Sequence, residues 1–244
     1  MTIALSTWKK PLAKPCIEGS LSERAYQLTL DQILRGALPL GAVVSRRSLA
    51  EQFGMSFIPL NAALQRLERD GLVESQPRVG TRVKIPTPEE VRSRFEMREA
   101  LECQSARLSA ERSTFQERLE LKRSAEQMDT LFARMDSDSA DRELLFAAQR
   151  YHTELHTKIA MYARSEVLRA AIETTHILVF NWLYNTATRL GALPEGFHQS
   201  LIATIITGDP DKAEAAMREH VRYRTDKVLQ SIAHVGADRW RQKR

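Results

Sequence analysis

Apolar and polar residues recur with the period of an α-helix through most of the chain, and a single strand-like segment interrupts this period. Three short helical patterns are followed by two strand-like runs, 72–74 and 81–85, which flank a turn with Arg78 near its tip. From residue 89 onward the pattern is helical throughout. The sequence therefore predicts a mainly α protein with one small hairpin in its first third.

Capping residues and glycines predict the limits of the three N-terminal helices. Ser22 is the expected N-cap of the first helix, and Ser45 and Ser56 are the expected N-caps of the second and third. Gly54 ends the second helix, because glycine tolerates the left-handed conformation that often closes a helix. Two helices, a turn, a third helix and a hairpin form a winged helix-turn-helix layout, expected over residues 21–85.

The remaining two thirds of the chain are expected to form an all-α helical bundle, because short loops separate all the helical patterns. The expected helices cover residues 89–112, 115–136, 140–163, 165–189, 194–207 and 210–234. The expected organisation is a mobile N-terminal arm at 1–20, the winged helix at 21–85, a linker at 86–89, the bundle at 90–235 and a basic tail at 236–244.

The charge of the chain is unevenly distributed. Residues 1–85 hold 12 Lys and Arg against 7 Asp and Glu, whereas residues 86–244 hold 24 of each kind. A basic segment beside a neutral one indicates a polyanionic partner for the first segment, such as DNA. The apolar stretch from His176 to Tyr184 is too short to cross a membrane, and two cysteines make no disulfide framework. A cytoplasmic location without membrane contact is therefore expected.

The recognition helix of a helix-turn-helix lies in the major groove, with its N-terminal residues at the base edges. Asn61 is suited to pair with adenine, whereas the hydroxyl of Ser56 either contacts a phosphate or only caps the helix. Basic residues beside the helix and at the wing are expected on phosphates and in the minor groove, although any one of them could simply be solvated. DNA contacts are expected from Arg46, Arg47, Ser56, Phe57, Asn61 and Arg78.

This segment resembles the DNA-binding domain of GntR-type bacterial transcription regulators. The similarity runs from about Leu28 to Val83, through the motifs ILRGALPLG, SLAEQFGMS, ALQRLERDGLV and RVGT. The family commonly has two arginines in the recognition helix where this chain has Phe57 and Asn61, while its arginine in the preceding helix corresponds to Arg47. The resemblance implies an operator-binding regulator with an altered operator sequence.

A pair of histidines gives a weak indication of metal binding. His152 and His156 are four residues apart, so they project from one face of one helix, as paired metal ligands often do. Many such pairs are surface residues, and both interpretations stay open from the spacing alone. A metal-dependent hydrolase is disfavoured, because Glu154 does not stand where the HExxH arrangement has its general base.

Residues 90–233 resemble the FCD effector domain of the FadR branch of the family. The similarity rests on MREALECQSARLSAE, LHTKIAMYARSEVL and FHQSLIATIITGDPDKAEAAMREHV. Many members bind a divalent metal with one Asp and three His. Carried over to this chain, the histidines are His156, His198 and His220, and His152 stands at the Asp position. His176 and His234 match no ligand position and are interpreted as structural or surface residues.

The resemblance implies a metabolite-responsive transcription regulator, a repressor in the commoner case, that acts as a homodimer on a pseudo-palindromic operator. Zinc or nickel is the expected cofactor, because neutral imidazoles suit these ions. A small organic acid is the expected effector, with Arg98 and Asn181 as candidate contacts and Tyr223 as a weaker one. For Arg98 the alternative is a salt bridge with Glu102. A metal sensor without an organic effector is the alternative function.

Overall fold

The computed structural model describes residues 20–76, 80–134, 142–186 and 193–223, and in addition residues 225, 228, 229 and 232. The chain divides into two compact units, with the boundary between Lys84 and Ile85. Residues 1–19 of the expected arm, Arg78 of the wing and the basic tail 236–244 lie outside the described residues.

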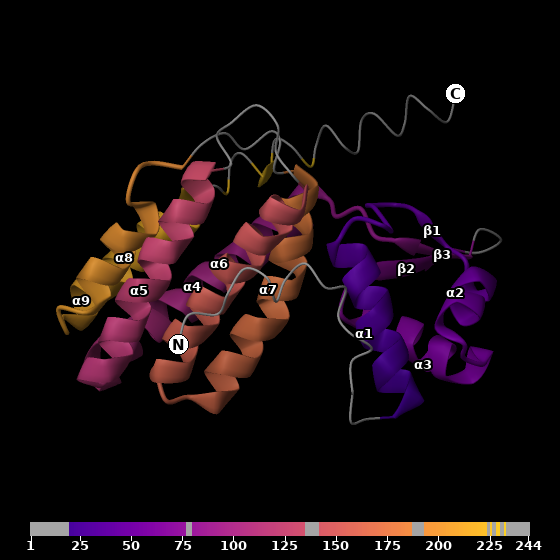
Figure 1. The fold of residues 1–244 in the computed structure, drawn as a ribbon, viewed down its shortest axis with the longest axis horizontal. Coiled ribbons are helices and arrows are strands. Elements are labelled where there is room, and N and C mark those ends of the chain that lie inside the picture. The colour runs from indigo at the N-terminus through magenta and orange to yellow at the C-terminus, as the bar shows by residue number, and fades with distance from the viewer. Residues whose placement is uncertain are drawn as a thin grey trace. The chain divides into compact units, whose positions relative to one another are not determined.

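The first unit is a winged helix-turn-helix, so the predicted fold class is confirmed for this part (Figure 1). Its elements are α1 (Leu21–Leu34), β1 (Val43–Val44), α2 (Arg46–Phe53), α3 (Phe57–Arg69), β2 (Val73–Gln76) and β3 (Gly80–Val83). The sheet is antiparallel in the order β1-β3-β2, with Val43 opposite Arg82 and Val73 opposite Val83. The sequence did not predict β1, because a two-residue strand carries too little alternation to be recognised.

Of the expected N-caps of α1 and α2, the first is wrong and the second is confirmed. The N-cap of α1 is Ser20, whose hydroxyl accepts the Glu23 amide at 3.2 Å, so the assignment to Ser22 was wrong. Ser45 caps α2 as predicted, accepting the Ser48 amide at 3.2 Å. The apolar faces of α1 and α3 then pack together as the core of this unit. The side chains buried there include Ile33, Leu60, Leu64 and Leu67.

The second unit is all-α, as predicted. Its helices in the described residues are α4 (Pro88–Arg112), α5 (Phe115–Ala133), α6 (Arg142–Tyr162), α7 (Glu166–Thr186), α8 (Phe197–Ile205) and α9 (Pro210–Arg222). A capping box at Thr87 starts α4, so the last two residues of the expected linker 86–89 are already helical. The last helix is described without a break only to Arg222, and most of its expected extension to 234 lies outside the described residues.

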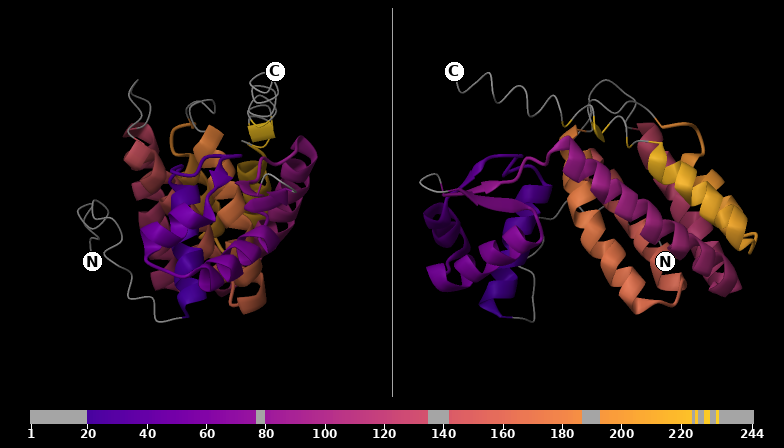
Figure 2. Two further views of the ribbon diagram at one scale, coloured as in Figure 1. Left: turned by 90° about the vertical axis from the view of Figure 1, so that its right-hand side faces the viewer. Right: turned by 180° about the vertical axis from the view of Figure 1, so that it is seen from behind.

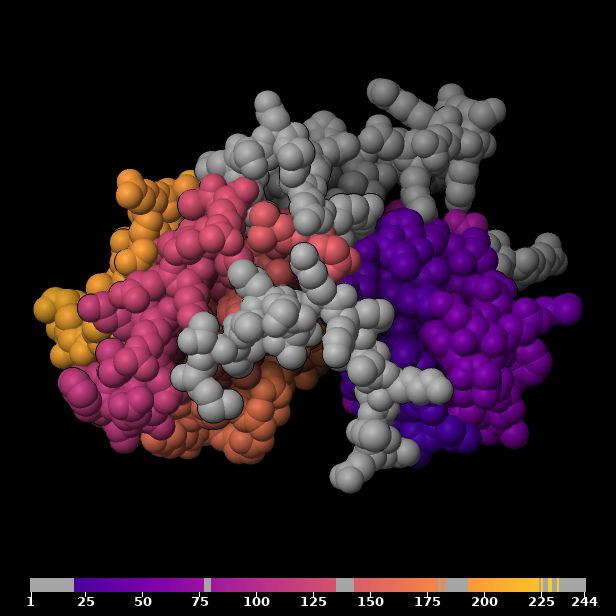
Figure 3. Space-filling view, in the orientation of Figure 1, coloured from indigo at the N-terminus to yellow at the C-terminus, as the bar shows by residue number. Residues whose placement is uncertain are grey.

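Helix α4 is the centre of this bundle. It contacts α6, α7, α8 and α9, and from behind it lies between α7 and α9 (Figure 2). The opposite face of the unit is built from α5, α6 and α7 (Figure 3). Helix α5 contacts both α6 and α8. Because α4 contacts α6, α8 and α9, side chains from these four helices can meet inside the bundle. No helix among the described residues is long and apolar enough to cross a membrane.

Candidate metal centre and DNA-binding surface

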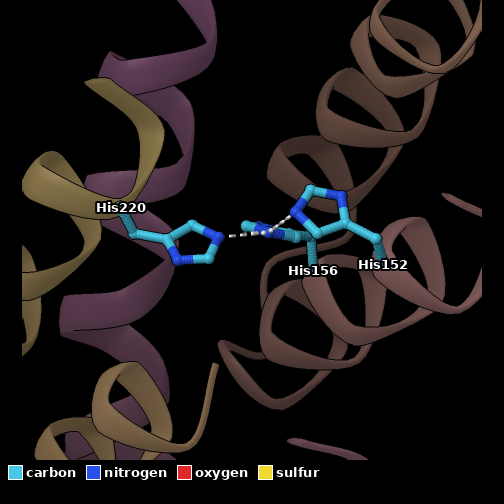
Figure 4. A group of neighbouring side chains, drawn as sticks. All are labelled: His152, His156 and His220. Carbon is cyan, nitrogen blue, oxygen red and sulfur yellow. Dashed lines mark hydrogen bonds between the residues drawn. The ribbon is translucent and has the colours of Figure 1, made fainter. Parts of the chain in front are cut away.

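Four histidines from three helices meet inside the helical unit. His152 and His156 lie on α6, one turn apart, while His198 lies at the start of α8 and His220 near the end of α9. His156, His198 and His220 are buried. His152 is partly exposed as a residue, but its imidazole is turned into the protein toward the others (Figure 4).

Three of these imidazoles converge closely. The Nε2 atom of His156 lies 3.2 Å from Nε2 of His152 and 3.2 Å from Nε2 of His220 (Figure 4). Two nitrogens bound to one zinc at about 2.0–2.1 Å are about 2.8–3.0 Å apart in octahedral geometry and about 3.3–3.4 Å apart in tetrahedral geometry. The Nε2 atom of His156 is therefore at the distance of a fellow ligand from each of the other two, and the ligand atoms of all three lie within 4.8 Å of one another.

His198 lies beside this group without joining it as tightly. Its ring centroid is 5.4 Å from that of His152 and 5.3 Å from that of His220. Nδ1 of His198 lies 2.6 Å from Oδ1 of Asp129 on α5. Asp129 also accepts the backbone amides of His198 at 3.1 Å and Gln199 at 3.0 Å, and so holds the start of α8 in place. The structure thus brings all four predicted ligands together, three of them within direct contact.

A buried carboxylate on α4 orients His156. Glu102 contacts Nδ1 of His156, and its other oxygen lies 2.8 Å from Nε2 of His176 and 2.5 Å from Nε of Arg98. A carboxylate on Nδ1 fixes the tautomer in which Nδ1 carries the proton and Nε2 is open to a metal. With that tautomer, the single lone pair on Nε2 of His156 faces two imidazoles at once, and one shared ion would satisfy all three.

Some of these contacts were not predicted from the sequence. Glu102 was expected only as a salt-bridge partner of Arg98, and that salt bridge is present. Asp129 was not predicted at all. His176 is a structural residue, with 1% of its surface exposed, and not a surface one. The only signal for Glu102 was its spacing of four residues from Arg98 on one helix face.

Burial keeps the clustered histidines neutral. It lowers the pKa of His152 and of His220 well below the ordinary value, and the neighbouring histidines add to the effect. Burial also lowers the pKa of His156 to about 4, although Glu102 opposes this. Burial disfavours ionisation of Glu102 as well, but Arg98 and the histidines hold its pKa well below the usual range. At neutral pH the site therefore presents uncharged imidazoles, the form that binds metals.

A small cavity of about 20 Å³ adjoins the histidines, and this volume holds about one water molecule. Of the candidate effector contacts, Arg98 lines it, and one terminal nitrogen of Arg98, Nη2, is buried without a hydrogen-bond partner. Asn181 is buried in α7 but does not line this cavity, and Tyr223 is 40% exposed. Gln149 is a lining residue that the sequence did not predict.

The predicted DNA-binding residues lie at the starts of α2 and α3. Phe57 and Asn61 are exposed. Ser56 is the N-cap residue of α3, but its side chain makes no capping hydrogen bond, so the interpretation as a side-chain cap is wrong. Arg47 is exposed and pairs with Glu51 at 3.0 Å. Arg46 donates a hydrogen bond to the Thr81 hydroxyl of β3 at 3.2 Å.

Two family descriptions match this chain. Residues 21–83 match the one described as "Bacterial regulatory proteins, gntR family", and residues 93–223 match the one described as "FCD domain". Among solved structures, E. coli McbR/YncC has a TM-score of 0.70 at 21% identity, covering 87% of this chain and 98% of that one. At this identity the likeness supports the fold alone.

Relatives of this chain are named as transcription regulators. A protein of Paenarthrobacter nicotinovorans, the "Probable D-xylose utilization operon transcriptional repressor", is 30% identical over 192 residues, 78% of this chain and 80% of that protein. The regulator LutR of Bacillus subtilis is 29% identical over 201 residues, 72% of this chain and 86% of its own.

Neither the surroundings of the histidine pair nor the matched families support a metal-dependent hydrolase. Glu154, the carboxylate nearest in sequence to the histidine pair, forms an ion pair with Arg150 at 3.2 Å and is 41% exposed. The matched families and the relatives are regulators of transcription and not enzymes. The chain belongs to the GntR family of bacterial transcription regulators, in the group that combines the DNA-binding domain with an FCD domain.

Proposed function

We propose that this protein is a transcriptional repressor whose helical unit binds one divalent metal ion and a small carboxylic acid beside it. The observation that carries the proposal is that the Nε2 atoms of His152 and His220 each lie 3.2 Å from Nε2 of His156. The metal ligands are His152, His156, His198 and His220. Repression is supported by the repressor names of relatives in Paenarthrobacter nicotinovorans and E. coli.

Zinc or nickel is the proposed ion. The donors are neutral imidazole nitrogens, which suit borderline ions better than they suit magnesium or manganese. No carboxylate oxygen is proposed as a ligand, because Glu102 and Asp129 already contact imidazole Nδ1 atoms. Those two carboxylates instead fix His156 and His198 with Nε2 toward the site.

The effector is proposed to be a small organic acid. A divalent ion held by the histidines would accept a carboxylate oxygen by expanding its coordination, or in place of one histidine. Arg98 is proposed to donate from Nη2, the atom that is buried without a partner while Nε pairs with Glu102. The cavity of about 20 Å³ holds only a water-sized group, so an acid of several carbons has to displace lining side chains such as Phe197 or Leu193. Asn181 is left out of the proposed contacts.

The protein is proposed to act as a homodimer in the cytoplasm. A single helix-turn-helix contacts only a few base pairs, so specificity requires two copies on a pseudo-palindromic operator in the cytoplasm. The helical unit is proposed to hold the two copies together. Acid binding then changes operator affinity by favouring one spacing of the two DNA-binding units over another. Light scattering of the full chain at micromolar concentration should give a mass near twice 27.8 kDa.

Elemental analysis of protein purified without a histidine tag tests the metal. We expect close to one equivalent of zinc or nickel per chain, either as purified or after zinc addition at neutral pH. No appreciable transition metal under both conditions would refute the metal site. The variant His152→Ala tests the substituted ligand position, because unchanged zinc affinity would leave three histidines as the only ligands.

A thermal-shift screen of small carboxylic acids tests the effector and the alternative function together. Acids that bind should raise the unfolding temperature of the zinc-loaded protein more than that of the metal-free protein. Arg98→Lys keeps the charge next to Glu102 but removes the planar fork, and should weaken the response. If zinc alone changes operator binding and no acid adds to the effect, the protein is a metal sensor instead.

A further inference from the structure

The outer face of α3 carries two large apolar side chains at the point where a recognition helix meets the bases. Phe57 keeps 54% and Ile58 keeps 82% of its surface exposed. Asn61 follows one turn later on the same exposed side. Pro59 and Leu60 are buried beneath them, so packing against the unit's core fixes which residues face outward.

This face carries no positive charge. The sequence of α3 contains no charged residue from Phe57 to Gln65. Its first charged residue is Arg66, which is paired with Glu23 of α1 and lies over the ring of Tyr26, 4.0 Å from the centroid. Specific contacts to guanine are made most often by Arg or Lys on O6 and N7, and the first two turns of α3 offer neither.

The side chains that are present match the other base pair. In the major groove thymine is marked by its 5-methyl group, which apolar side chains contact, and adenine by an acceptor and a donor that suit Asn. We infer that α3 recognises A·T pairs, with Phe57 and Ile58 against thymine methyl groups and Asn61 on the adenine edge. The inference rests on the DNA-binding role of this unit and is independent of the metal site.

The same contact explains why these apolar side chains are exposed in the protein without DNA. Adjacent large apolar groups in water are unfavourable, and they become buried when a methyl-lined groove closes over them. Affinity from charge is supplied next to this face, by Arg46 and Arg47 at the start of α2. Contacts to phosphate carry no sequence information, so in this protein charge provides attachment and the apolar face provides base preference.

Deoxyuridine substitution tests the inference directly, because it removes the 5-methyl group of thymine and leaves base pairing intact. The full-length protein is first used to select binding sites from a library of random duplexes. We expect A·T-rich half-sites in which one or two thymines, when replaced singly by deoxyuridine, each weaken binding by about fourfold. That factor corresponds to the burial of one methyl-sized group.

Variants link the lost methyl group to individual side chains. Phe57→Ala and Ile58→Ala should each bind the thymine site more weakly and lose the distinction between thymine and deoxyuridine at one position. Phe57→Leu, which stays apolar, should keep part of that distinction. Arg47→Ala is the matched control: it should weaken binding to both duplexes and keep the distinction. Circular dichroism and thermal melting verify that the variants fold, as expected for exposed positions.

Several outcomes would overturn the inference. These are G·C-rich selected half-sites, no sequence preference at all, no thymine whose methyl group affects binding, or a methyl effect that survives in both alanine variants. A protein that bound no duplex under any condition would instead remove the DNA-binding function itself, and the two failures are therefore distinguishable.

Discussion

The recognition face of α3 and the histidine cluster of the helical unit obtain chemical selectivity in opposite ways. The recognition face is exposed, uncharged and formed by Phe57, Ile58 and Asn61 of a single helix. The histidine cluster is buried and ionisable, with its imidazoles drawn from α6, α8 and α9 and its carboxylate partners from α4 and α5. Exposed apolar groups gain their energy when a partner covers them, whereas buried imidazoles are desolvated by folding and are ready for an ion beforehand.

Removing the central ligand should have the largest effect on zinc binding by the histidine cluster. His156→Gln should lower zinc affinity more than about 100-fold, because its Nε2 lies between two other ligands and its Nδ1 is held by Glu102. Zinc affinity is measured by competition with a chelating dye. Glu154→Gln is the control on the same helix and should leave the affinity unchanged. Equal loss in both variants would mean that the effect comes from α6 as a whole.

Removing the orienting carboxylate tests whether the buried partners of the histidines set the metal affinity. Glu102→Gln keeps the shape of the side chain but removes the charge that holds His156 and faces Arg98. We expect a loss of zinc affinity of about 10- to 100-fold, as is usual for residues that orient a ligand. The same titration on Asp129→Asn tests His198 in parallel. If neither variant changed the affinity, the carboxylates would have only a packing role.

Acid should affect the helical unit through its histidines, because residues 21–83 contain none. The pKa of His156 falls from 6.5 in the unfolded chain to about 4 in the folded protein, and those of His152 and His220 also fall. Between these values the unfolded state binds more protons than the folded state. The unfolding free energy of metal-free protein should therefore decrease as pH falls from about 6.5 to about 4, by up to ~1.4 kcal/mol per pH unit from His156, and His152 and His220 should contribute with the same sign.

Urea titrations at a series of pH values measure this dependence. Removing one of the titrating groups, as in His156→Gln, should give a shallower decrease than the wild-type protein shows. An unfolding free energy that stayed constant over this pH range would mean that the imidazoles are not desolvated.

The smallest effect is expected on the charged part of the DNA-binding surface. Arg47 is exposed and pairs only with exposed Glu51, so Arg47→Ala should leave thermal stability unchanged. Operator affinity should fall by a similar factor for all sequences, and the dependence of log affinity on log salt should decrease by about one unit. Fluorescence anisotropy over a range of salt concentrations measures both. A change of base preference would contradict the division between attachment and readout.

The histidine cluster marks the limit of prediction from the sequence. The spacing of His152 and His156 fixed their common helix face, but only the resemblance to the FCD domain suggested that His198 and His220 join them. Glu102 and Asp129 were not predicted as partners of these histidines, since a carboxylate on a helix is usually solvated and nothing local distinguishes a buried one. The N-cap of α1 was misassigned by two residues, because Ser20 and Ser22 both suit that position.

The helices, the wing and the residues at the start of α3 could be predicted without coordinates, because periodicity, capping and turn chemistry act over a few neighbouring residues. The sequence by itself also determined that this recognition helix lacks the two arginines common in its family. Only the tertiary structure decided which imidazoles face one another, which carboxylate holds each of them and which nitrogen of Arg98 is left without a partner. Contacts such as His156 with His220, His198 with Asp129 and His176 with Glu102 join residues 64 to 74 positions apart, and they depend on how whole helices pack.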